Sequence, residues 1–167
     1  MAGRLITEPA DIRAILDRTR AVAVVGVSAD WKRPSHYVMK YIQSRGVRTI
    51  PVNPRAVGEP ILGEKVYASL SDIPDRFDMV DLFRKSEDIP PIVDEAIGLA
   101  AAKGIKTIWM QLGISNDAAA LKAVAAGLDV VQDRCLKIEY GRHHSELAWG
   151  GFNTGVISAK RPKARLS

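Results

Sequence analysis

The sequence contains little cysteine and little histidine. Cys135 is the only cysteine among 167 residues, and there are only three histidines. A single cysteine excludes an internal disulfide and fits a reducing compartment, and so small a set argues against a Cys/His zinc site. The sequence also lacks an apolar run long enough for a signal peptide or a membrane span. We therefore expect a cytoplasmic protein with no metal and no membrane partner.

Several catalytic signatures are absent as well. There is no G-x-S-x-G, no P-loop and no H-E-x-x-H, which argues against the hydrolases, NTPases and metalloproteases that carry these motifs. Asp78 and Asp81 flank Met79 and Val80 at the start of a predicted strand, where the alternation of side chains sends the two carboxylates to opposite faces. Because they form no catalytic pair, we expect a binding module without catalytic residues.

The positive charge gathers at one end of the chain. Most of the net charge of +5 comes from four residues near the C-terminus, namely Lys160, Arg161, Lys163 and Arg165. Short basic ends of this kind are usually solvated, so nucleic acid is not expected as a partner. We assign residues 1–145 to one domain and residues 146–167 to a C-terminal extension that ends in this basic tail.

Apolar runs alternate with helical patterns along the chain. With 47% hydrophobic and 26% charged residues, the composition is typical of a globular domain with a sizeable core. The alternation predicts an α/β fold, a three-layer doubly wound parallel sheet of about five strands. Buried strands are expected at residues 21–25, 47–52, 79–83, 106–110 and 128–131.

Helices are expected before the first of these strands and between the strands. Thr7 and Ser115 are predicted to cap two of them, and Pro34 suits the first position of a third. The pattern is weaker from residue 53 to residue 75, where we expect a long loop with one short strand at residues 65–67 and a brief helix at residues 69–73.

In open parallel sheets, ligands bind beyond the carboxyl ends of the strands, near the point where the strand order reverses. This rule selects the loops at residues 26–35, 53–55, 84–86 and 111–114. The first of these loops precedes a helix, so free backbone N–H groups of Ser35, His36 and Tyr37 are expected to face a phosphate, with charge from Lys32 and Arg33. The alternative is an ordinary turn with both cations solvated.

The second loop lacks the acidic residue that binds the ribose of NAD. Asn53, Pro54 and Arg55 stand there instead, and Arg55 suits a ribose that carries a phosphate. NADP and coenzyme A both carry such a phosphate, and these residues do not separate them. A simple turn at Asn53 and Pro54 is the other interpretation.

Five motifs together resemble a known family. These are VGVS, PVNP, DLFR, WMQLGI and DRCLKIEY, within residues 12–142. In this order they resemble the small stand-alone CoA-binding proteins of bacteria and archaea and, more distantly, the CoA-binding domain of the succinyl-CoA ligase α subunit. The resemblance implies a Rossmann-like fold that holds coenzyme A, or a short acyl-CoA, along the strand tips.

The resemblance also implies roles for individual residues. Those expected to meet the diphosphate are Gly26, Ser28, Lys32 and Ser35. Those expected to meet the adenosine portion are Asn53, Pro54 and Arg55. Phe83 and Arg84 are expected to flank the nucleotide, and Gln111 and Gly113 to line the path of the pantetheine.

Histidine and cysteine need separate interpretations. The ligase α subunit carries its phosphorylated histidine in a further domain, so His143 and His144 are expected to be surface residues without a catalytic role. His36 either touches a phosphate or is an ordinary first-turn residue. Cys135 either pairs with the thiol of coenzyme A as a mixed disulfide or is a buried apolar cysteine, the reading that we favour.

Two other functions remain open. An NADP-linked oxidoreductase would use the same crevice, although no hydride-acceptor site is visible in the sequence. A nucleotide-sensing regulator of the kind found among redox-responsive repressors would need a winged helix ahead of Ala21, and the preceding residues are too few to form one. A homo-oligomer or a partner enzyme is compatible with the sequence.

Overall fold

Five short parallel strands form the centre of the protein. The computed structural model describes residues 3–143. The strands are β1 (Ala21–Val25), β2 (Arg48–Val52), β3 (Met79–Leu82), β4 (Thr107–Met110) and β5 (Asp129–Val131). The helices are α1 (Pro9–Arg18), α2 (Pro34–Ser44), α3 (Ile89–Lys103) and α4 (Asp117–Ala125), with 3-10 turns η1 (Leu70–Asp72) and η2 (Ser86–Asp88). Helical residues 136–143 follow β5.

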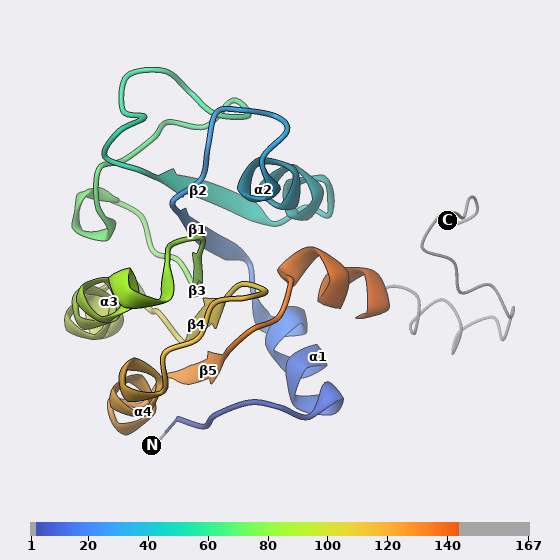
Figure 1. Ribbon diagram of the computed structural model, residues 1–167, viewed down its shortest axis with the longest axis vertical. Helices are drawn as coiled ribbons and strands as arrows, with labels where there is room; N and C mark the ends of the chain where they lie inside the picture. The colour runs from blue at the N-terminus through green and yellow to red at the C-terminus, as the bar shows by residue number, and fades with distance from the viewer. Residues whose placement is uncertain (1–2, 144–167) are drawn as a thin grey trace, which may run out of the picture.

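The strands pair in the order β2-β1-β3-β4-β5, all parallel (Figure 1). The chain therefore first adds β2 on one side of β1 and then crosses to the other side to form β3. The reversal opens a crevice between the carboxyl ends of β1 and β3, which is where doubly wound sheets bind ligands.

Helices cover both faces of the sheet, as Figure 1 shows. Helices α3 and α4 pack on one face, while α1, α2 and helical residues 136–143 pack on the other. The predicted fold class, a three-layer doubly wound parallel sheet of five strands, is confirmed.

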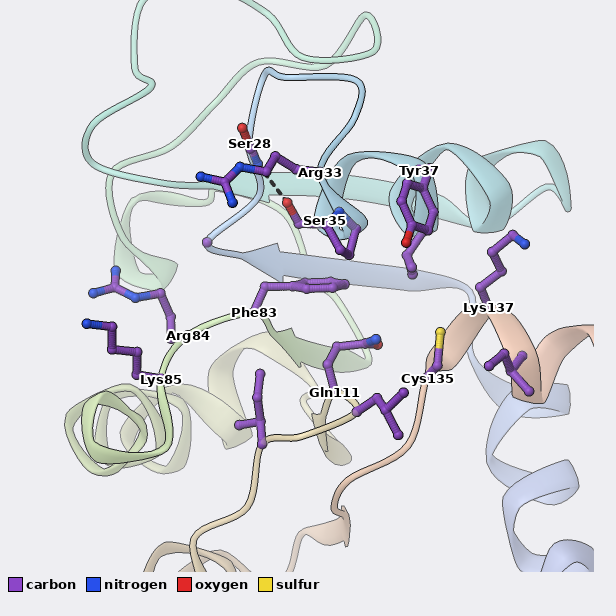
Figure 2. Close-up of a pocket in the computed structure, with 16 residues that line it drawn as sticks. Ser28, Arg33, Ser35, Tyr37, Phe83, Arg84, Lys85, Gln111, Cys135 and Lys137 are labelled. Carbon is purple, nitrogen blue, oxygen red and sulfur yellow. Dashed lines mark hydrogen bonds between the residues drawn. The ribbon is translucent and has the colours of Figure 1, made fainter.

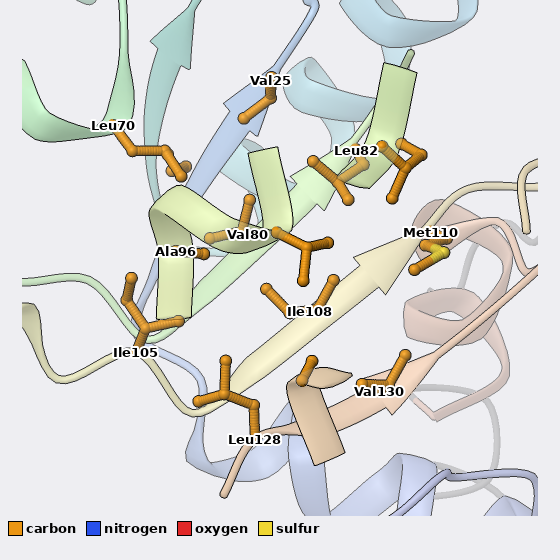
Figure 3. Close-up of a cluster of buried hydrophobic side chains, with 14 of the residues drawn as sticks. Val25, Leu70, Val80, Leu82, Ala96, Ile105, Ile108, Met110, Leu128 and Val130 are labelled. Atoms are coloured by element: carbon orange, nitrogen blue, oxygen red, sulfur yellow. The ribbon is translucent and has the colours of Figure 1, made fainter. Parts of the chain in front are cut away.

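Both faces of the strands are apolar because both are covered. On the α3 and α4 side, Val80, Ile108 and Val130 come from neighbouring strands and belong to one buried cluster with Ala96 of α3 (Figure 3). On the other side, the buried residues include Val24, Trp109 and Tyr140. Every strand residue from Val22 to Val25 is buried, in agreement with the continuous apolar run in the sequence.

The predicted short strand at residues 65–67 is wrong. Only an isolated bridge joins Tyr67 to Val52: the Tyr67 N–H donates to the Pro51 carbonyl, and the Tyr67 carbonyl accepts from the Asn53 N–H. The pairing ends there because the chain turns into η1, the brief helix that was expected at residues 69–73.

Both predicted N-caps are also wrong. Helix α1 begins at Pro9 after Glu8, which makes no side-chain cap, because the fixed φ of proline suits the first turn without one. Helix α4 is capped by Asn116, whose side-chain oxygen accepts from the Ala119 N–H at 3.0 Å, one residue after Ser115. Pro34 does occupy the first position of α2.

Within residues 3–143, no helix has both the length and the apolar character that a membrane crossing requires. The predictions for His144 and for the extension at residues 146–167 fall outside the described residues. The division of the chain into a domain and an extension therefore stays a prediction.

Candidate functional site

A cavity of about 800 Å³ lies at the carboxyl ends of the strands (Figure 2). Its wall comes from the loops after β1, β3 and β4, from the start of α2, and from residues 135–138 after β5. This is the crevice that the reversal of strand order opens, and its volume is in the range of small-molecule sites.

Gly26 allows the tips of β1 and β3 to meet at the floor of the cavity. Its φ is 87°, a left-handed conformation that favours glycine, and a Cβ here would lie 2.4 Å from the Phe83 carbonyl oxygen. The Gly26 N–H donates to the Val52 carbonyl at 2.8 Å. A larger residue would therefore push the two strand ends apart.

The loop between β1 and α2 is fixed by its own polar groups. The Ser28 N–H donates to the hydroxyl of the buried Ser35 at 2.9 Å, and the Ser28 hydroxyl accepts from the Asp30 N–H at 3.0 Å. The predicted free N–H groups at the start of α2 are only partly available. Those of His36 and Tyr37 donate to the Arg33 carbonyl, because the first turn closes tightly on itself.

The charged side chains of the cavity wall are all positive. Its charged residues are Arg33, Arg84, Lys85 and Lys137, and no aspartate or glutamate lies among the lining residues of the described chain. The Nη2 atom of Arg84 lies 3.3 Å from Oδ2 of Asp88, which does not line the wall. Both side chains are more than a third exposed. Such a wall favours an anionic ligand.

The polar side chain at the far end of the wall is Gln111. It follows β4 and is 4% exposed. Its Oε1 atom accepts from the Leu136 N–H at 3.1 Å, so its amide nitrogen turns toward the cavity, as Figure 2 shows. The aromatic ring of Phe83, which follows β3, lies across the cavity floor between Gln111 and the start of α2.

Six of the eleven predicted binding residues lie together in this wall. They are Gly26, Ser28, Ser35, Phe83, Arg84 and Gln111. Lys32 does not line the cavity, and its neighbour Arg33 does. Gly113 lies in an exposed turn outside the wall, where its N–H donates to Asp133.

The three residues predicted for the adenosine portion lie outside the cavity wall. The Asn53 amide donates to the Val27 carbonyl at 2.9 Å, and its side-chain oxygen accepts from the Arg55 N–H at 2.9 Å. Asn53 thus joins the loop after β2 to the loop after β1. Pro54 and Arg55 are exposed beside this junction.

The wall also contains residues that sequence reasoning did not assign to binding. Tyr37, Lys85, Cys135, Lys137 and Ile138 line it. Three of these five lie in DRCLKIEY, the last motif of the resemblance. That motif was the sequence signal that could have assigned them to the site. The favoured reading of Cys135 as a buried apolar residue is not met, because its half-buried side chain faces the cavity.

The described histidines lie outside the cavity. His143, expected at the surface, is 6% exposed because helical residues 136–143 pack onto α1, where its Nε2 atom lies 2.8 Å from the Asp17 carboxylate. His36 does not line the wall. Within the described part of the chain, no three His, Cys, Asp or Glu side chains gather as a candidate metal site.

The sequence matches a known family over most of this fold. The profile of the CoA binding domain family matches residues 20–141, which span all five strands. The chain belongs to the CoA-binding domain family.

One relative of this CoA-binding domain is the uncharacterized protein YneT of Bacillus subtilis, which is 36% identical over 131 residues, 78% of this chain and 93% of YneT. Acetate–CoA ligase (ADP-forming) II of Archaeoglobus fulgidus is 34% identical over 144 residues. That match covers 84% of this chain but only 19% of the ligase, so the chain corresponds to a small part of that enzyme.

Solved structures show the same fold. A hypothetical protein from Pyrococcus horikoshii OT3 is 40% identical, with a TM-score of 0.75 over 83% of this chain and 93% of that one. A protein from Thermus thermophilus is 36% identical, with a TM-score of 0.71 over 82% of this chain and 99% of that one. Each of these structures shares the fold of this chain over more than nine-tenths of its own length.

Proposed function

We propose that the cavity binds coenzyme A or a short acyl-CoA and that the protein acts as a binding module in the cytoplasm. The charge of the cavity wall is the observation that supports this proposal most directly. In a chain of the CoA-binding domain family, four cations line the crevice between β1 and β3, and no acid lies among the lining residues that the structure describes. Coenzyme A combines phosphates with a long neutral arm, and the wall combines cations with Phe83, Gln111 and Ile138.

The order of the strands suggests how the ligand lies. We place the diphosphate at the start of α2, near Ser28, Arg33 and Ser35, where the helix field and a charged side chain act together. The adenosine portion then extends toward the junction of Asn53 and Arg55. The pantetheine arm extends in the opposite direction, over the ends of β3 and β4.

Calorimetric titration with coenzyme A tests this proposal. A hydrogen bond to a charged group contributes about 1.5–3 kcal/mol, so Arg33→Ala is expected to weaken binding by about 10-fold to 100-fold. Lys40→Ala is the matched control, because Lys40 is an exposed cation on α2, the helix that begins directly after Arg33, and lies outside the wall. We expect this control to bind like the wild type.

Two results would contradict the proposal. One is the absence of binding at about millimolar coenzyme A, a concentration at which even a weak site fills. The other is an equal effect of Arg33→Ala and Lys40→Ala. A parallel titration with NADPH tests the oxidoreductase alternative, for which NADPH must bind more tightly than coenzyme A.

A further inference from the structure

Cys135 lies where the free end of the proposed ligand would arrive. The segment that follows β5 folds back over the end of β4, where the Arg134 N–H donates to the Met110 carbonyl at 3.3 Å and the Arg134 carbonyl accepts from the Trp109 indole at 2.8 Å. These bonds hold Cys135 beside Gln111, in the cavity wall. In the strand order β2-β1-β3-β4-β5, this end of the site is opposite the junction of Asn53 and Arg55.

Gln111 indicates independently that a polar ligand reaches this end. Its side chain is 96% buried, since its exposed fraction is 4%. The Oε1 atom is occupied by the Leu136 N–H, whereas the amide nitrogen has no hydrogen-bond partner among residues 3–143. Figure 2 shows this amide and the Cys135 sulfur pointing into the same space, which Tyr37 and Phe83 border. An amide donor held in this way suits a carbonyl oxygen of the pantetheine arm.

We propose that Cys135 is a site of thiol–disulfide exchange with a disulfide of coenzyme A. The inference rests on the proposed function, because binding of the nucleotide delivers the sulfur to this end of the cavity. The reacting sulfurs carry one negative charge throughout the exchange, and Lys137 contributes a positive charge to the same wall, with its ammonium group 5.3 Å from the centre of the Tyr41 ring.

The exchange balances without a further reagent. The Cys135 thiolate attacks one sulfur of the coenzyme A disulfide, the S–S bond of that disulfide breaks, and a bond forms between Cys135 and the bound coenzyme A half. The other half leaves as a thiolate and takes up the proton that Cys135 has lost. Cys135 is oxidised, the coenzyme A disulfide is the oxidant, and one molecule of coenzyme A thiol is released.

Selectivity for the nucleotide distinguishes this site from an ordinary reactive thiol. Binding of the diphosphate makes the attack effectively intramolecular, which raises the rate relative to a disulfide that does not bind. Pantethine and glutathione disulfide offer the same reacting bond without the nucleotide. We therefore expect the adduct to form at least about tenfold faster with coenzyme A disulfide than with either of them.

Intact-mass spectrometry of the full chain without reductant measures this rate. Cys135 is the only cysteine, so any disulfide adduct identifies its own site. We expect one coenzyme A per chain, removed by dithiothreitol, and no adduct on Cys135→Ser. Gln111→Glu keeps an acceptor for the Leu136 N–H but loses the amide donor. It is expected to slow the reaction with coenzyme A disulfide more than that with glutathione disulfide, because its new negative charge acts on both reactions whereas the lost amide contact concerns coenzyme A alone.

A titration with reduced coenzyme A, in the presence of reductant, separates this inference from the proposed function. The wild type should bind reduced coenzyme A under these conditions. If it binds but the adduct forms no faster with coenzyme A disulfide than with glutathione disulfide, the exchange site is overturned and the binding function stands. If it does not bind, the proposed function fails and the inference fails with it.

Discussion

Asp81 carries a carboxyl group into the interior of the sheet. It lies in β3, opposite Val24 on one side and Trp109 on the other, and is 0% exposed. Neither carboxyl oxygen has a hydrogen-bond partner among the described residues. Burial raises the pKa of Asp81 well above its ordinary value of 3.8, because desolvation penalises the charged form.

This burial predicts how stability depends on pH. The folded chain keeps a proton on Asp81 that the unfolded chain loses above about pH 4, so the free energy of unfolding falls as pH rises from there toward the folded pKa. Asp81→Asn has no such proton. The free energy of unfolding is measured with urea at about pH 5 and at about pH 8. Relative to the wild type, that of the variant should be higher at pH 8 than at pH 5, and the difference should grow by up to about 1.4 kcal/mol per pH unit.

Glu59→Gln is the control for this measurement, because Glu59 is exposed in the loop after β2. Its pH profile should follow that of the wild type. If Asp81→Asn also follows the wild-type profile, the carboxyl group is charged in the folded protein and the account of its burial is wrong.

At the scale of elements, the strands were predictable and several of their connections were not. The runs at residues 21–25 and 79–83 are apolar throughout because both faces of the sheet are covered, and this local property is visible in one sequence. Whether Ser115 or Asn116 caps α4 depends on one residue of register. That register is set by tertiary bonds, including the one from the Asn116 amide to the Ser86 carbonyl.

The same reasoning explains which parts of the site could be predicted. Gly26 and Phe83 follow strands directly, so the rule for strand ends finds them. Cys135 and Lys137 reach the cavity only because the segment after β5 folds back over β4, through bonds such as that from the Arg134 N–H to the Met110 carbonyl. Such a return depends on contacts between distant residues, which the local pattern does not encode.

Asn116 provides a prediction for α4. Its side-chain oxygen accepts from the Ala119 N–H, and its amide donates to the Ser86 carbonyl at 3.1 Å. Asn116→Ala removes both bonds and should lower the free energy of unfolding by about 1–2 kcal/mol. Ser115→Ala, one residue earlier, removes an exposed side chain without a cap and should change it by less than about 0.5 kcal/mol. Chemical denaturation of both variants measures the difference, and equal losses would contradict the assignment of the cap.

At the scale of the whole molecule, the loops at one edge of the sheet are arranged to contact successive parts of an elongated ligand. Parallel strands end at one edge, so the loops after β2, β1, β3 and β4 lie in a row, in that spatial order. In the proposed pose, this row carries Arg55 and Arg33 at its nucleotide end and Gln111 at its thiol end. Each end of coenzyme A is then held by residues from a different part of the chain.

Fragments of the ligand test this division between the two ends. Adenosine 3′,5′-bisphosphate contains the nucleotide end alone, so it should compete with coenzyme A for the cavity. Arg33→Ala should weaken the fragment and coenzyme A by a similar factor, about tenfold or more, because both place a phosphate near this side chain. Gln111→Glu should weaken coenzyme A and leave the fragment unchanged, because the fragment does not extend to the end of β4.

Competition calorimetry with the two ligands on both variants gives four affinities, and their pattern decides the orientation. A fragment that is insensitive to Arg33→Ala but sensitive to Gln111→Glu would mean that the nucleotide lies over β4 and the ligand runs the other way. In that orientation Cys135 would face the adenosine phosphates instead of the thiol. The same measurement therefore determines which end of the cavity can bring a sulfur atom to Cys135.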